Sequence, residues 1–223
     1  MTNPRRDFLG WLGASALLGA TASPLSASAA EAMAPRALDS KWDMSWTDKL
    51  TGKYRAVFDS PEVSEGAALF RAVFWQDNYQ EVYGTDAKTM NPVIVFRHEA
   101  ISLIMNDAYW AKFEVGKSTK LKTPEGKKWA VANPIRVSLA DTPPKWAKYN
   151  LESFIAGGGI VLACNLAFGD VVSAFQEKEK IKVRADARKR ALEHIIPGVI
   201  LQPSGVFATL RAQEGGCHYI LAS

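Results

Sequence analysis

The sequence predicts an α/β protein in which a mostly parallel sheet of about five strands lies between two layers of helices. Short apolar or alternating runs recur along the chain, and a segment with helical spacing follows most of them. Strands separated by helices favour a parallel sheet, because the helical crossovers cover both of its faces. The domain is expected over residues 53–223, with an excursion at about 116–148, after a signal peptide at 1–29 and an arm at 30–52.

The first 29 residues are predicted to be a signal peptide of the twin-arginine type. Arg5 and Arg6 precede an apolar run, Phe8–Ala20, which is too short for a membrane helix of about 20 residues. The small residues Ala27–Ala29 then supply a cleavage site. We therefore expect a protein that is exported folded to the periplasm and has no stable membrane insertion after cleavage.

The exported chain is long enough to bury a full hydrophobic core without disulfide staples. Its net charge falls from +4 to +3 once Arg5, Arg6 and Asp7 are removed, which is too small to predict a nucleic-acid partner. The arm carries Trp42 and Trp46 without clean periodicity. We expect it to pack on the domain by these indoles, and we assign it no function.

The first strand and helix of the domain are predicted between residues 53 and 84. The segment Lys53–Ser60 alternates between apolar and polar residues, as a strand does. The segment Ser64–Gly84 has apolar residues at helical spacing, with Ser64 as the expected N-cap and Gly84 as the stop. A strand followed directly by a helix is the first unit of the predicted fold.

The second unit begins with the apolar run Val93–Phe96, which Pro92 is expected to bound, and turns helical after His98. The excursion that follows is rich in lysine. We interpret it as a solvated loop, because charge runs are usually exposed, rather than as an anion-binding site. Within it, residues 127–139 are predicted to form a hairpin or an edge strand.

The carboxyl-terminal third completes the predicted sheet. A short helix capped by Asn150 leads into the apolar strand Ile160–Cys164, and one helix is then expected from Asp170 to Ile196. The remaining predicted elements are two short strands within 199–206 and 217–222 and, between them, a helix capped by Ser204.

The two cysteines, Cys164 and Cys217, are predicted to lie at opposite edges of this sheet. Cys164 ends its strand, whereas Cys217 begins the last one. A disulfide is the ordinary expectation for an exported protein, but it needs Cα atoms within about 7 Å of each other, so an intramolecular bond is disfavoured. Ligands and reactive groups gather at the carboxyl ends of parallel strands, which makes Cys164 the candidate reactive residue.

The surroundings of Cys164 suit a nucleophile. A short loop, Asn165–Gly169, is expected before a helix that begins near Asp170. The oriented N–H groups of a helix N-terminus favour the thiolate, which is the form that attacks sulfur. The alternative is a buried structural cysteine, because free cysteine is among the most buried residue types.

His98 is the second candidate residue, because it holds the equivalent place at the end of the preceding strand. If the two strands are neighbours, its imidazole and the thiol of Cys164 could meet and exchange a proton. The pair could instead hold copper or zinc, with Met105 or Glu99 near in sequence, although no spacing matches a metal motif. A histidine bonded to a backbone carbonyl is the remaining alternative. No cofactor and no metal ligands are assigned.

The end of the chain carries an ordered set of motifs downstream of Cys164. They are Pro197-Gly198-Val199, Pro203-Ser204-Gly205-Val206, Leu210, Gln213, Gly216 and Tyr219-Ile220. This set resembles the carboxyl-terminal signature of the DsrE/DsrF-like sulfur-relay family. The resemblance implies a compact α/β/α domain that assembles into homo-oligomers, in which Cys164 carries sulfane sulfur as a persulfide. It also implies a redox or sulfur-transfer protein as the partner.

Overall fold

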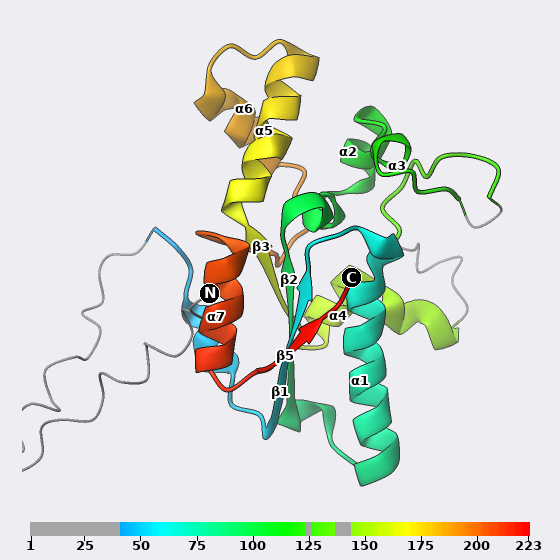
Figure 1. The fold of residues 1–223 in the computed structure, drawn as a ribbon, viewed down its shortest axis with the longest axis vertical. Helices are drawn as coiled ribbons and strands as arrows, with labels where there is room; N and C mark the ends of the chain where they lie inside the picture. Colours follow the sequence, from blue (N-terminus) through cyan, green and yellow to red (C-terminus); the bar gives the residue numbers. More distant parts are fainter. Residues whose placement is uncertain (1–40, 124–125, 137–143) are drawn as a thin grey trace, which may run out of the picture. The chain divides into compact units, whose positions relative to one another are not determined.

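The structure is a computed structural model that describes residues 41–123, 126–136 and 144–223 (Figure 1). The predicted signal peptide and the first part of the predicted arm lie outside these residues. Five parallel strands form one sheet between two layers of helices, which confirms the predicted α/β/α class. Among the described residues, no helix is both long enough and apolar enough to cross a membrane.

The sheet has the strand order β4-β3-β2-β1-β5, with β4 and β5 at its edges. Its strands are β1 Tyr54–Ser60, β2 Met90–Phe96, β3 Ile160–Cys164, β4 Ile200–Gln202 and β5 His218–Leu221. All four pairings are parallel, so the carboxyl ends of all five strands lie along one side of the sheet, perpendicular to the outer strands β4 and β5. We call this the carboxyl edge.

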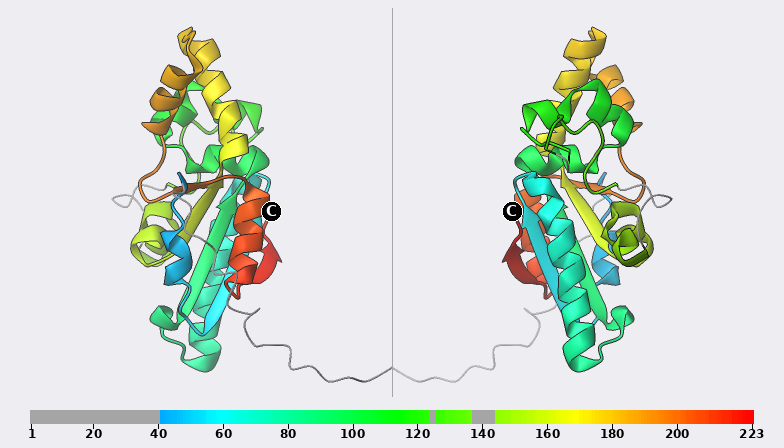
Figure 2. Two further views of the ribbon diagram at one scale, coloured as in Figure 1. Left: turned by 90° about the vertical axis from the view of Figure 1, so that its left-hand side faces the viewer. Right: turned by 90° about the vertical axis from the view of Figure 1, so that its right-hand side faces the viewer.

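Helices connect these strands. The α-helices are α1 Ala67–Tyr83, α2 Asp107–Lys112, α3 Val115–Ser118, α4 Leu151–Ala156, α5 Asn165–Glu179, α6 Arg184–Leu192 and α7 Gly205–Glu214. The 3-10 helices are η1 Ser45–Lys49, η2 Ser64–Gly66, η3 Ala87–Thr89, η4 His98–Ile104 and η5 Pro144–Tyr149. Figure 2 shows α7 and α1 on opposite faces of the sheet, while α5 and α6 extend beyond its carboxyl edge.

Alternation along the strands divides the buried side chains between the two faces. The face under α7 is covered by what we call the α7-side core: Trp46, Leu50, Val57, Val93, Val95, Ile160, Leu162, Ala208, Ala212 and Cys217. The other face packs on α1 and α4. Each large side chain buried in these clusters contributes about 1.5 to 3 kcal/mol of transfer free energy.

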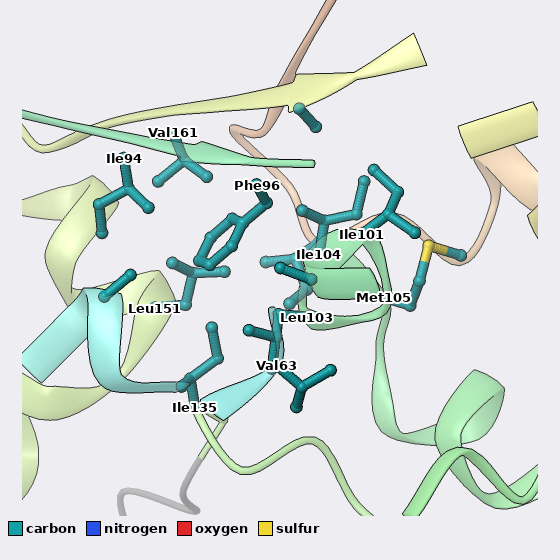
Figure 3. Close-up of a cluster of buried hydrophobic side chains, with 14 of the residues drawn as sticks. Val63, Ile94, Phe96, Ile101, Leu103, Ile104, Met105, Ile135, Leu151 and Val161 are labelled. Atoms are coloured by element: carbon teal, nitrogen blue, oxygen red, sulfur yellow. The ribbon is translucent and has the colours of Figure 1, made fainter. Parts of the chain in front are cut away.

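The larger core, on the α1 side, fixes the segment that follows β2. Figure 3 shows Ile94 and Phe96 of β2 packed toward Leu103 and Ile104 of η4, all of them fully buried. Because η4 is pinned in this way directly after β2, the short stretch between them is held at the carboxyl edge. That stretch includes Arg97.

The described part of the predicted arm packs by an indole, as expected. Trp46 is fully buried in the α7-side core, and the backbone beside it forms η1. Gln202 of β4 donates its amide to the carbonyl of Asp43, at 2.9 Å. The arm is therefore attached to the edge strand as well as to the core.

Two predictions for the first half of the domain were wrong, and the helical turn expected after His98 is confirmed. Ser64 is not the N-cap of α1, because Glu65 and Gly66 take positive φ angles and the helix begins only at Ala67. Pro92 lies inside β2, paired with Ala56, rather than before it. The segment after His98 is a 3-10 helix.

The excursion contributes no strand to the sheet within its described residues. An isolated antiparallel bridge joins Lys122 to Trp129, and the N–H of Ala130 donates to the carbonyl of Leu121. The predicted hairpin is therefore shifted toward the N-terminus. Residues 137–139 of that prediction lie outside the described residues.

The helix expected from Asp170 to Ile196 is two helices, and it starts earlier. The first, α5, begins at Asn165, directly after β3, so the predicted loop does not form. Lys180 then takes a left-handed conformation with φ 58°, which ends α5 before α6 begins. The N-caps predicted at Asn150 and Ser204 are confirmed, since each side chain accepts a hydrogen bond from a backbone N–H of its helix.

Candidate functional site

The carboxyl edge gathers polar and reactive side chains from every strand of the sheet. In sheet order from β4 to β5 they are Gln202, Cys164, Arg97, Asp59 and Tyr219. Cys164 pairs with Gln202 across β3 and β4. On its other side, Phe96 pairs with Ala163, so Arg97 stands next to Cys164 one step beyond the last paired residues.

Cys164 is both the last residue of β3 and the N-cap of α5. Its Sγ accepts a hydrogen bond from the backbone N–H of Ala167, at 3.4 Å. The residue is 7% exposed and its thiol is free. The sulfur therefore occupies the position usually taken by a serine or aspartate oxygen, where the N–H groups of the first helical turn face negative charge.

Arg97, Asp59 and Tyr219 form one hydrogen-bonded group next to Cys164. The guanidinium of Arg97 is bidentate on Asp59, with Nε to Oδ1 at 2.8 Å and Nη2 to Oδ2 at 2.9 Å. The hydroxyl of Tyr219 donates to the same Oδ2 at 3.0 Å. Asp59 is 3% exposed, so this fork satisfies a carboxylate that would otherwise be costly to bury.

Electrostatics couple Arg97 to its neighbours. The hydrogen bond to Asp59 is the largest cause of a raised pKa for the Arg97 guanidinium. The negative charges of Asp59, Tyr219 and Cys164 in their ionised forms raise that pKa further, while burial opposes them. Arg97 is therefore within electrostatic reach of charge on the thiol of Cys164.

The first turn of α7 packs directly on the stem of Arg97. A Cβ added at Gly205 would lie 2.6 Å from both Cβ and Cδ of Arg97, closer than real side chains approach. Ser204 caps this helix by accepting from the N–H of Phe207, at 3.1 Å. Only glycine at this position lets the helix N-terminus and the arginine lie against each other.

A second arginine contacts the first turn of α5, directly after Cys164. Nη2 of Arg188, in α6, donates to Oδ1 of Asn165 at 2.7 Å, and its guanidinium lies 5.3 Å from the centre of the Phe168 ring. Arg188 also lines a pocket of about 490 Å³ with Lys41, Trp42 and residues 195–201. Among the described residues, no carboxylate forms an ion pair with Arg188.

His98 lies at the carboxyl edge, but its side chain is exposed. The strands β2 and β3 are neighbours, as a meeting of His98 with Cys164 requires. His98 takes a positive φ of 50° and forms no hydrogen bond with any described residue. The position next to the thiol in the strand register belongs to Arg97.

Met105 and Glu99, the alternative metal ligands near His98 in sequence, do not lie together at the carboxyl edge. Met105 is fully buried in the α1-side core, whereas Glu99 is exposed. Across residues 41–123, 126–136 and 144–223, no three His, Cys, Asp or Glu side chains are grouped closely enough to hold a metal ion.

Cys217 differs from Cys164 in its place in the fold, although both are buried free thiols. It precedes β5, at the opposite edge of the sheet, and is buried in the α7-side core. Burial raises the pKa of its thiol to about 11, although Arg55 acts in the other direction. Both cysteines are free, so the disfavoured disulfide does not form.

Sequence reasoning placed Cys164 at this edge but did not single out Asp59 or Arg97. Both interrupt or end apolar runs, Asp59 after Ala56–Phe58 and Arg97 after Val93–Phe96. Charged residues at the ends of neighbouring apolar runs could have indicated this site, because the carboxyl ends of parallel strands lie along the same side of the sheet.

Compared with known proteins, the chain matches no protein-family model and no curated protein. The DsrE/DsrF-like resemblance therefore stays a prediction based on the motifs of the carboxyl-terminal third. A layered α/β/α fold hosts many unrelated functions, so the function must be argued from the site.

Proposed function

We propose that the protein is an exported sulfur carrier that accepts sulfane sulfur on Cys164 as a persulfide and passes it to an acceptor thiol. The observation that carries this proposal is the position of Cys164: a free thiol that caps α5 at the carboxyl edge, next to Arg97 in the strand register. The sulfur faces the first turn of α5, where the N–H of Ala167 bonds to it, and the thiolate form of a cysteine is the nucleophile in sulfur exchange.

The proposed reaction is an exchange without net oxidation. The thiolate of Cys164 attacks the outer sulfur of a donor R–S–SH, and an S–S bond forms as the donor's S–S bond breaks. The bonding pair leaves with the donor as R–S⁻, while the transferred sulfur keeps its proton and becomes Cys–S–SH. Attack by an acceptor thiolate on that outer sulfur reverses the step and returns Cys164 to its thiolate.

The burial of Cys164 suits a carrier more than a general thiol reagent. With 7% of the residue exposed, small donors reach the sulfur more readily than bulky ones, and the persulfide is shielded from unwanted thiols. We include His98 as an assisting residue, because its exposed imidazole at the same edge can take or give a proton as donor and acceptor exchange. Replacing His98 by Gln is expected to slow transfer without preventing loading.

The proposal includes a periplasmic location, a homo-oligomeric state and a redox or sulfur-transfer protein as partner. A carrier needs one partner to load it and another to unload it, which is why a docking protein belongs to the proposal. Light scattering of the purified protein tests the oligomeric state: a mass above that of one chain is expected, and a monomer at all concentrations would contradict it.

Intact mass spectrometry before and after exposure to polysulfide tests the function. The parent protein is expected to gain the mass of one sulfur atom and to lose it on reduction. The Cys164→Ser variant should gain none, while Cys217→Ser, the matched control, should behave as the parent. Equal sulfur uptake by Cys164→Ser and parent would refute the carrier role.

A further inference from the structure

The part of the carboxyl edge around Cys164, which we call the Cys164 corner, carries positive charge that neighbouring carboxylates do not fully neutralise. Asp59 is the one carboxylate paired with Arg97, and Arg188, which bonds to the residue after Cys164, has no carboxylate partner among the described residues. Arg97 packs on the first turn of α7 and Arg188 bonds to the first residue of α5, while Asp59 is the one carboxylate of the described residues that forms an ion pair with either arginine. Such a balance favours an anion.

Arg97 is the cation best placed to meet a ligand at the sulfur. It stands next to Cys164 on a neighbouring strand, and such strands lie about 4.8 Å apart. Asp59 occupies Nε and Nη2, which leaves Nη1 without a hydrogen bond to any described residue. The side chain as a whole is 31% exposed, so it is open in part to a ligand from solvent.

The surroundings of Arg97 hold it in place rather than merely cover it. Asp59 fixes the plane of the guanidinium, Tyr219 fixes Asp59, and Gly205 lets α7 press on the aliphatic stem. A purely structural ion pair would need only the first of these contacts. A guanidinium preorganised in this way pays little entropy when it binds an anion.

We propose that the site takes sulfur donors that carry negative charge, such as hydropolysulfides and ionised persulfides, and that Arg97 is the residue that binds this charge. This inference rests on the proposed function. When the Cys164 thiolate attacks the outer sulfur of an ionised persulfide R–S–S⁻, the products are Cys–S–S⁻ and R–S⁻: the transferred sulfur keeps its charge and the S–S bonding pair leaves with the donor. Arg97 therefore interacts with negative charge before and after the S–S bond breaks. Neutral organic trisulfides gain nothing from it.

The test compares an anionic with a neutral alkylating reagent on Cys164. The rate ratio of iodoacetate to iodoacetamide reports the electrostatic environment of the sulfur, because the thiolate fraction cancels in the ratio. We expect Arg97→Gln to lower this ratio about tenfold, the size expected for one unit charge several ångström away near a protein surface. Arg97→Lys should keep most of the ratio, since it keeps the charge.

Two further variants guard against misfolding. Arg211→Gln removes an arginine of α7 whose side chain is 43% exposed and pairs with Glu214, and should leave the ratio unchanged. Asp59→Asn removes the compensating charge while its amide can still bond Arg97, so the ratio should rise above that of the parent. A ratio that is the same in the parent, Arg97→Gln and Asp59→Asn, with each variant folded by circular dichroism, overturns the assignment of Arg97.

Loading with hydropolysulfide and with a neutral trisulfide separates this inference from the proposed function. Arg97→Gln should load more slowly from hydropolysulfide, by about the same factor of ten, and equally from the trisulfide. Equal slowing with both donors would overturn the inference and leave the carrier role intact. A charge-dependent alkylation ratio in a protein that accepts no sulfur would sustain the anion site and refute the carrier.

Discussion

Single residues at the carboxyl edge differ in how far the sequence could predict them. The end of an apolar run placed Cys164, because strand ends in a parallel sheet are readable from composition alone. Its role as N-cap was not readable, since the expected loop Asn165–Gly169 consists of residues that tolerate either conformation. Tertiary contacts with Arg188 and β3 hold Asn165 in the helix.

The group of Arg97, Asp59 and Tyr219 was beyond prediction for another reason. Its members are separated by 38 and 160 positions, and they meet because β2 and β5 pair with β1 on its two sides. Neither periodicity nor spacing reports a strand order of this kind. The likeness of Tyr219-Ile220 to a family motif marked the residue without indicating its partner.

The two cysteines should react with thiol reagents at very different rates. Cys217 has a pKa of about 11, so its thiolate fraction at neutral pH is small and rises about tenfold with each pH unit up to that value. We expect iodoacetamide at pH 7.5 to modify Cys164 well before Cys217, with peptide mass spectrometry as the readout. Faster modification of Cys217 would mean that burial does not govern the reactivity of these thiols.

At the scale of elements, the strands were predicted better than the helices. The central strands β1, β2 and β3 are largely buried on both faces, and such burial leaves their apolar runs few alternatives. The helix ends depended on single residues with positive φ, such as Gly66 and Lys180, of which only a glycine is visible in a sequence. The break between α5 and α6 was missed for this reason.

The described part of the arm should be stabilised by one side chain. Trp46 is fully buried, and its Nε1 has no hydrogen-bond partner among the described residues. Trp46→Ala is expected to lower the free energy of unfolding by about 3 to 5 kcal/mol, because it leaves a large cavity. Trp46→Phe keeps most of the ring volume and removes the unpaired N–H, so about 1 to 2 kcal/mol is expected.

Chemical denaturation of both variants checks this prediction. Equal loss in the two would show that a phenyl ring does not replace any of the packing of the indole. No loss in either would show that the arm does not contribute to the core. A matched control is Trp129→Ala, since that indole is 41% exposed.

The elements beyond the carboxyl edge should be sensitive to acid through His194. Nδ1 of His194 lies 3.1 Å from Oδ1 of Asn106, its ring lies against Phe175, and Nε2 has no partner among the described residues. Burial lowers the pKa of this imidazole. Of the charged side chains around it, Arg190 and Lys112 lower the pKa further, while Glu179 and Glu193 oppose them.

The sign of the effect follows from proton binding. Below the ordinary histidine pKa of about 6.5, the unfolded chain takes up a proton that the folded chain resists, so stability falls as the pH drops. We expect the thermal unfolding midpoint to fall between pH 7 and pH 5.5, and His194→Gln to flatten this dependence. The exposed His218, replaced by Gln, is the control; an unchanged slope in His194→Gln would contradict the account.

At the scale of the whole molecule, the fold class followed from the sequence and the function did not. Alternating strands and helices allow few architectures, whereas the same architecture hosts carriers, binding proteins and enzymes. The case for sulfur transfer therefore depends on one corner of the sheet, where a capping thiol meets an arginine. The sulfur-transfer proposal is therefore tested most directly by the chemistry of Cys164.

Peptide-resolved mass spectrometry of the protein after hydropolysulfide exposure, with persulfides trapped by alkylation, tests the central claim most directly. The account predicts one additional sulfur atom on the peptide that contains Cys164, none on the peptide that contains Cys217, and loss of that sulfur to an added acceptor thiol. Sulfur on Cys217 alone, or on neither peptide, would contradict it.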